Sequence, residues 1–168
     1  MKRLLILLAL LFVFAVSRET IATTGTITVS IENVDAMVQG ATNKQTVITV
    51  DCTATAGGAV SGSLAALYAA TSASNPQITA IVGKIKSIET IPGASGDKTT
   101  SLPTPLYDLV LTDSYGLDVS ATNLGNRSGT VAEKVVPVSD IPVNSELTLT
   151  GANCGSGSKF RIIITLGQ

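Results

Sequence analysis

Apolar and polar residues alternate with a period of two in several stretches of this 168-residue chain. The clearest stretches are Ile27 to Ile31, Thr46 to Thr55 and Phe160 to Leu166. This period places every second side chain on one face, which predicts β-strands with one buried face. Cys52 falls on the apolar face of the second stretch. The polar, glycine-containing segment Asn33 to Asn43 is interpreted as the connection between the first two strands.

Three further stretches predict strands with local irregularities. Ile78 to Ile91 is long and loses its alternation toward the end, so we expect a bulge or bend near Ser87. Val131 to Val138 is strand-like, but Pro137 has no backbone N–H and confines the later part of this strand to an edge or to its end. Glu146 to Thr150 alternates around two leucines.

The centre of the chain, Pro103 to Val119, predicts a β-hairpin. The side chains on its predicted buried face are Tyr107, Leu109 and Leu111. Residues 113–116, Asp-Ser-Tyr-Gly, have the composition of a tight turn, in which glycine takes positive φ without strain. The residues that follow, Leu117 to Val119, would begin the return strand.

One segment has a helical pattern. Apolar residues recur at helical spacing from Ser63 to Ser74, where alanine is abundant, so a short helix is expected there, ending before Pro76. About eight predicted strands, separated by turn residues, make up the rest. We therefore expect an all-β fold in which residues 18–168 form one domain. That domain would be a two-sheet antiparallel β-sandwich of jelly-roll or immunoglobulin-like topology.

The central segment also carries a sequence motif. Its residues are Tyr107, Asp108, Leu111, Asp113, Gly116 and Asp118, followed by Val119. The motif resembles one in a family of small tailed-bacteriophage virion proteins, which are mostly uncharacterised. Flanking pieces at residues 91–93 (Ile-Pro-Gly) and 126–128 (Asn-Arg-Ser) fit the same family, and the resemblance covers roughly Lys84 to Pro137. It implies a structural role in a virion, with other virion proteins or copies of the chain itself as partners.

Residues 1–17 have the organisation of a secretory signal. Lys2 and Arg3 precede an uninterrupted apolar run from Leu4 to Val16, and small residues precede a cleavage point at Arg18. The run is short for a bilayer core of about 30 Å. Cleavage is therefore favoured over a retained N-terminal anchor, which would be the chain's one contact with a membrane. The signal predicts an exported protein (secreted, periplasmic or at the cell surface), while the resemblance predicts a virion.

Composition narrows the classes of partner. The chain has 11 Lys and Arg against 12 Asp and Glu, and without Lys2 and Arg3 the balance is nine against twelve. Such a chain is not expected to bind nucleic acid, because that binding depends on clustered Lys and Arg. Only four aromatic residues follow the apolar run, so the core must be built from Val, Ile and Leu.

The sequence contains no histidine. This removes Ser-His and Cys-His nucleophile pairs and the commonest metal ligand. A glycine-rich phosphate loop between a strand and a helix is also missing from the sequence. We therefore expect no enzymatic activity and no cofactor, and a hydrolase that uses carboxylates alone is the least favoured alternative.

Asp108, Asp113 and Asp118 are the only clustered acids in the sequence. Asp113 and Asp118 could place oxygens around calcium, but the full calcium-loop pattern is absent. The favoured interpretation is that Asp113 makes a side-chain turn to the backbone and that Asp118 caps the returning strand.

Cys52 and Cys154 are the two cysteines of the chain. In a reducing cell they would be separate thiols, whereas export favours a disulfide between them. Such a bond would close a loop of about 100 residues and contribute on the order of 4 to 5 kcal/mol in the chain-entropy treatment. Because the N-terminus predicts export, we expect the disulfide.

The polar loop Ala121 to Thr130 contains Asn126, Arg127 and Ser128, and Arg127 is expected to pair with Asp118 or Glu133. This loop and the loop Pro92 to Ser101 flank the predicted hairpin, so both are expected to form contact surfaces.

Two functional hypotheses follow. The leading one is a non-enzymatic, homo-oligomeric structural module of a phage virion, in a decoration, fibre-base or tail component. The alternative is a secreted or periplasmic bacterial surface-binding domain that acts like an adhesin.

Overall fold

The computed structural model describes residues 25–38, 41–64, 81–120, 124–137 and 141–167, while the side chains of residues 33–38, 41–44 and 81 lie outside the description. These ranges contain nine strands and one short 3-10 helix, η1. The elements are β1 (Thr26–Val38), β2 (Ala41–Thr53), β3 (Val60–Ser63), β4 (Ile81–Pro92), η1 (Ala94–Gly96), β5 (Asp108–Thr112), β6 (Glu133–Val135), β7 (Ile141–Ser145), β8 (Thr148–Ala152) and β9 (Lys159–Gly167).

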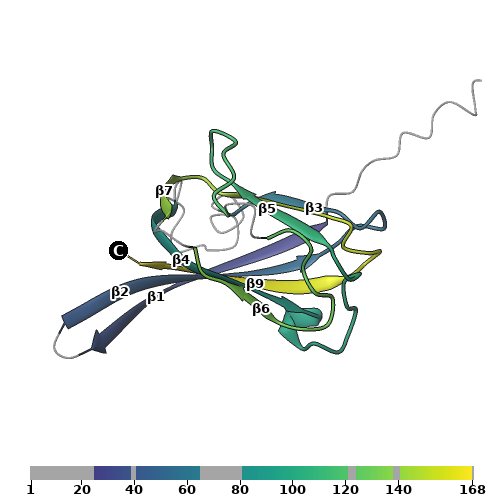
Figure 1. Cartoon of the computed structure of the whole chain (residues 1–168), viewed down its shortest axis with the longest axis horizontal. Helices are drawn as coiled ribbons and strands as arrows, with labels where there is room; N and C mark the ends of the chain where they lie inside the picture. Colours follow the sequence, from purple (N-terminus) through teal and green to yellow (C-terminus); the bar gives the residue numbers. More distant parts are fainter. Residues whose placement is uncertain (1–24, 39–40, 65–80, 121–123, 138–140, 168) are drawn as a thin grey trace, which may run out of the picture.

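The strands form two antiparallel sheets that make a β-sandwich (Figure 1). The larger sheet has the order β1-β2-β9-β4-β6, and β7 also pairs with β4. The smaller sheet has the order β3-β8-β5. The predicted all-β sandwich is therefore confirmed. The last strand in sequence, β9, lies at the centre of the larger sheet, where it joins β2 to β4.

Alternation along the strands builds the core, as the sequence predicts. On β9 the side chains of Phe160, Ile162 and Ile164 are buried, and the residues between them are half-buried. Ile162 lies opposite Val50 of β2, so these buried faces coincide in the ladder. The smaller sheet contributes leucines from β5 and β8 to the same aliphatic core. Each fully buried side chain of this size contributes roughly 1.5–3 kcal/mol.

One strand assignment from the sequence is corrected and another is confirmed. The segment Asn33 to Asn43, expected to be a polar connection, is mostly strand, because β1 continues to Val38 and β2 begins at Ala41. Their register runs without interruption, so the backbone groups of β1 that face β2 can be paired along the whole length of the strand. The bulge expected near Ser87 is confirmed, since the β4–β9 register shifts between Ile85 and Ser87.

The predicted central hairpin is only half formed. The strand β5 is present with the expected buried face, but the return segment makes a single bridge, between Thr112 and Asp118. The continuous ladder partner of β5 is β8, which pairs with one edge of it from Asp108 to Thr112. The residues after the turn bond to its other edge at separate points, where the Leu111 carbonyl oxygen accepts the Val119 N–H at 2.8 Å and the Leu109 N–H donates to the Leu124 carbonyl oxygen at 3.0 Å.

Several predictions fall on residues that are not described. The secretory signal over residues 1–17 and most of the helix expected from Ser63 to Ser74 belong to this group, although Ser63 itself ends β3. The described part of the chain contains no helix that is long and apolar enough to cross a bilayer.

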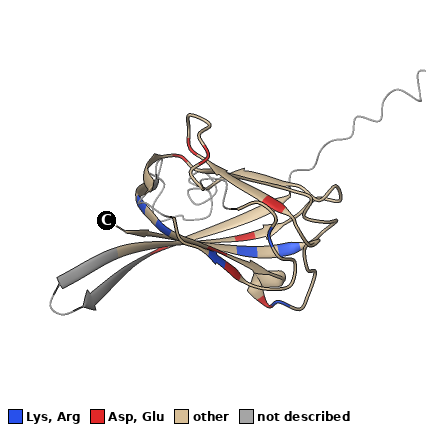
Figure 2. Cartoon of the chain, in the orientation of Figure 1, with Lys and Arg blue, Asp and Glu red and all other residues tan. Residues whose placement is uncertain are grey.

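Charged residues of both signs are scattered over the sandwich (Figure 2). The best-defined pair joins β9 to β2, where Arg161 Nε and Nη2 donate to the two carboxylate oxygens of Asp51 at 2.8 Å each. This bidentate geometry raises the pKa of Arg161. The pair ties the two central strands of the larger sheet together on its outer face.

Candidate functional site

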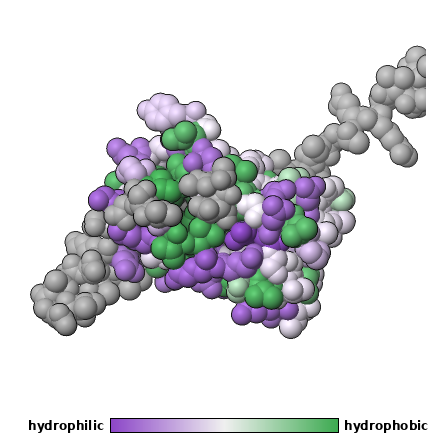
Figure 3. All heavy atoms as spheres, in the orientation of Figure 1, coloured by the Kyte–Doolittle hydropathy of each residue, from purple (hydrophilic) through white to green (hydrophobic). Residues whose placement is uncertain are grey.

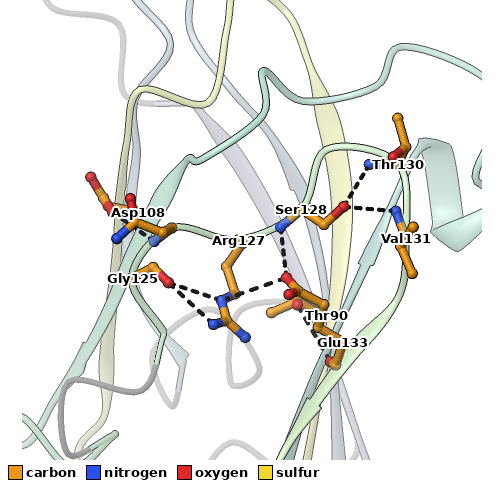
Figure 4. Close-up of polar contacts among 9 residues, drawn as sticks. Thr90, Asp108, Gly125, Arg127, Ser128, Thr130, Val131 and Glu133 are labelled. Atoms are coloured by element: carbon orange, nitrogen blue, oxygen red, sulfur yellow. Dashed lines mark hydrogen bonds and ion pairs between the residues drawn. The ribbon is translucent and has the colours of Figure 1, made fainter.

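The residues around β5 join the two sheets through a polar cluster (Figure 4). Tyr107, the residue before β5, is fully buried, and its ring centroid lies 5.2 Å from that of Phe160 on β9. Its backbone forms a bridge with Arg127, whose N–H donates to the Tyr107 carbonyl oxygen at 2.7 Å. The loop expected as a contact surface is thereby fixed to the start of β5.

Glu133, at the start of β6, holds this loop from the other side. One of its carboxylate oxygens accepts a hydrogen bond from the Ser128 N–H at 2.6 Å and lies 3.7 Å from Arg127 Nε. Of the two partners expected for Arg127, the structure therefore brings Glu133 into contact. The Arg127 guanidinium also donates twice to the Gly125 carbonyl oxygen, at 3.2 and 3.1 Å, and its side chain is only 14% exposed. Arg127 thus folds back onto its own loop.

The Tyr107 hydroxyl ends inside this cluster. It is buried and makes no hydrogen bond of normal geometry with the residues that the structure describes. Burial is the main cause that raises the pKa of Tyr107, and the nearby Thr90 hydroxyl opposes this shift. The tyrosine is therefore neutral at physiological pH. A buried hydroxyl without a good partner costs stability, which the ring contact with Phe160 offsets in part.

Asp108 is the first residue of β5 and connects it to two loops. One carboxylate oxygen accepts the Asn126 N–H at 2.9 Å, and the other accepts the Asn153 side-chain amide at 3.3 Å. Asn126 has a φ of 53°, a left-handed conformation that asparagine tolerates better than most residues. The carboxylate therefore fixes the bend that carries the chain into Arg127.

Asp113 and Asp118 act as turn residues. One Asp113 carboxylate oxygen accepts the N–H groups of Tyr115 and Leu117, both at 2.9 Å. Asp118 accepts the Ser120 N–H at 2.8 Å and its hydroxyl at 2.5 Å. These are the local bonds that the turn interpretation predicts. Within the described ranges, no group of three or more metal-ligating side chains comes together.

The turn after β5 presents two apolar side chains to solvent. Tyr115 is 91% exposed and Leu117 is 67% exposed. The segment stands clear of the body of the sandwich in Figures 1 and 3. Its backbone is closed by two further bonds, from the Gly116 N–H to the Asp113 carbonyl oxygen and from the Asp113 N–H to the Leu117 carbonyl oxygen, both 3.0 Å. We call Tyr115 and Leu117 the apolar tip.

The disulfide predicted for an exported chain is wrong for this structure, because Cys52 and Cys154 are both free, buried thiols. Burial is the main cause that raises their pKa, to about 11 for Cys154 and further for Cys52. The thiolate is the form that reacts in disulfide exchange, so both side chains are held in their unreactive form. The Cys154 thiol donates to the Ala152 carbonyl oxygen at 3.6 Å.

The second expected contact loop, Pro92 to Ser101, is organised by Asp97. This carboxylate accepts the N–H groups of Thr99 and Thr100, at 2.9 and 3.0 Å, and the Thr100 hydroxyl. The bond from the Thr100 hydroxyl is the largest cause that lowers the pKa of Asp97 from 3.8 to about 2. The loop is therefore an ordered surface feature next to β4.

Sequence reasoning overlooked three features of this region. Thr90, on β4, reaches the Glu133 carbonyl oxygen at 3.5 Å, a contact between residues far apart in sequence that no local pattern predicts. The bond from the Asn153 side-chain amide to Asp108 joins residues 45 apart, and no motif marks it. The exposure of the apolar tip could have been inferred from the sequence, because Tyr115 sits at the centre of the turn, where side chains point to solvent.

Comparison with known proteins finds no matching family model, no matching curated protein and no matching solved structure.

Proposed function

We propose that this chain is a non-enzymatic structural module that works by binding other protein subunits, as a component associated with a phage virion. The observation that carries the proposal is the apolar tip. The Asp113 carboxylate holds the backbone of Tyr115 and Leu117 in one turn conformation, while their side chains bury little of their own surface. A turn whose backbone is ordered before binding loses little conformational freedom when a partner covers it.

The polar groups around β5 support the same proposal. Asp108, Arg127 and Glu133 each satisfy groups of the protein's own backbone or side chains. Their contacts join β5, β6 and the loop between them into one unit. A rigid scaffold with ordered turns is the construction expected of a module that binds its partners by shape.

A second candidate is a secreted or surface-bound binding domain. It is favoured by the exposure of Tyr115, because an aromatic ring on an ordered turn can stack against a ligand or insert into a pocket. The apolar N-terminal segment of the sequence fits this candidate as well.

Mass spectrometry of purified phage particles tests the proposal. We expect the chain to co-purify with particles through a density gradient, at a constant ratio to the major capsid protein. A double variant, Tyr115→Ser with Leu117→Ser, should reduce incorporation. Val136→Ser is the matched control, because Val136 is 65% exposed but lies outside the tip. Recovery of the chain only from the cell surface or the medium would favour the second candidate and reject the first.

A further inference from the structure

The two edges of the larger sheet differ in how they are protected. On the β4 side the edge is covered by β6, with three residues, and β7, with five. On the other side β1 has 13 residues, and no strand in the described part of the chain pairs with its outer edge. Along that edge, no strand among the described residues bonds to the backbone N–H and C=O groups that do not face β2.

Natural proteins blunt exposed edges with short strands, prolines, lysines or bulges. The β4 side has such devices, with Pro142 in β7 and Lys134 in β6. The sequence of β1, Thr-Ile-Thr-Val-Ser-Ile-Glu-Asn-Val-Asp-Ala-Met-Val, contains no proline, lysine or glycine. Its register with β2 is continuous over all 13 residues, so no bulge twists the edge away. The longer edge, formed by β1, therefore has none of these protective features.

Among the described strands, the far end of β1 pairs with β2 alone. The β2–β9 ladder ends where Gln45 pairs with Gly167. Beyond that point the residues Asp35–Val38 pair only with the first residues of β2, and the ribbon runs past the sandwich in Figure 1. A two-stranded ribbon alone is marginally stable in water, whereas a third strand makes it stable. The ribbon therefore has the geometry of an element that is completed by a partner.

We infer that β1 pairs antiparallel with β1 of a second copy, across a two-fold axis perpendicular to the larger sheet. This inference rests on the proposed function and names the partner and the surface. A strand edge is self-complementary under such an axis, so a second copy needs no further adaptation to fit it. The outward side chains described on β1 carry one charge, on Glu32, so repulsion between copies is small. The two larger sheets become one continuous sheet.

Cysteine scanning of the full chain tests the inference. Single cysteines are placed at every second position from Thr26 to Val38 and oxidised under mild conditions, with the molar mass of the wild-type chain followed by light scattering. Cys52 and Cys154 stay in place, because their burial keeps them unreactive. Controls are Ser61→Cys on β3 and Lys134→Cys on β6, both exposed positions on other edge strands.

We expect a species of twice the monomer mass and cross-linking that peaks at one or two neighbouring β1 positions and falls off on both sides. A monomer at all concentrations up to about 100 μM would overturn the inference, as would a dimer that cross-links only through β3 or β6. Neither of these results would reject the proposed function, which is tested separately by the presence of the chain in particles. Loss of the chain from particles while β1 still cross-links would reject the proposed function alone.

Discussion

Asp108 and Asp113 lie near opposite ends of β5, and both accept backbone N–H groups, yet they stabilise different kinds of structure. Asp108 bonds to Asn126 and Asn153, which are 18 and 45 residues away in sequence. Asp113 bonds to Tyr115 and Leu117, two and four residues away. The first carboxylate ties separate elements into the sandwich, and the second shapes one exposed turn.

This contrast separates stability from binding within one short segment. Interactions between distant elements are lost when the domain unfolds, so weakening them lowers the free energy of unfolding of the whole domain. Bonds within a turn can break while the core stays intact. We therefore expect the Asp108 end to control stability and the Asp113 end to control the presentation of the apolar tip.

The largest effect is expected at the buried face of β5. Leu109→Asp places a carboxylate where the native side chain is 3% exposed, and it should cost about 4 kcal/mol or more in the free energy of unfolding. Val110→Asp, on the opposite face at 38% exposure, should cost about 1 kcal/mol or less. Urea denaturation measures both. Equal losses would mean that both faces of β5 are buried.

The polar cluster should give the next largest effect. Glu133→Ala removes the acceptor of the Ser128 N–H and the carboxylate beside Arg127, so about 2 kcal/mol should be lost. Glu133→Gln keeps an acceptor for the N–H and should recover about half of that loss. Thermal unfolding compares them. If the alanine variant were as stable as wild type, Glu133 would not be holding the loop.

A direct comparison of the two aspartates should show the smaller cost at the turn. Asp108→Ala should lower the free energy of unfolding by about 1–2 kcal/mol, because it frees donors on two loops. Asp113→Ala should cost about 0.5–1 kcal/mol, since the freed N–H groups lie in an exposed turn and can bond to water. Ser114→Ala is the control, because the bond from Ser114 to the Ser145 hydroxyl is made by its backbone N–H, which the substitution keeps. A larger loss for Asp113→Ala than for Asp108→Ala would contradict the assignment of stability to the Asp108 end of β5.

The apolar tip should have the smallest effect on stability. Tyr115→Ser with Leu117→Ser should change the free energy of unfolding by no more than about 0.5 kcal/mol, because both side chains are exposed. Calorimetry of the isolated chain measures this change. A loss of more than about 2 kcal/mol would show that the tip packs against the domain and is not presented to a partner.

The period of two predicted the strands in which apolar side chains lie on one face and polar side chains on the other. Ile48, Val50 and Cys52 alternate with polar residues and are all buried on β2. The short strand β3, Val60–Ser63, has one large apolar residue, too few to mark a period. The strand β7 contains Pro142, which suggests a loop until its edge position is known.

Pairing between distant segments could not be predicted from local patterns. The turn composition after β5 predicts a return along this strand, but no local pattern predicts that β8, more than 35 residues later, forms its continuous ladder. The turn roles of Asp113 and Asp118 could be predicted because their bonds reach at most four residues. The contact between Thr90 and Glu133 depends on how β4 pairs with β6, and only the fold supplies that.

The central claim is that the edge of β1 binds a second copy of the chain, while the β5 region stabilises the domain. Hydrogen–deuterium exchange of the wild-type chain at low and high protein concentration tests it most directly. We expect the β1 amides to exchange more slowly as concentration rises, while the β5 amides stay equally protected throughout. Exchange in β1 that is independent of concentration would contradict the account.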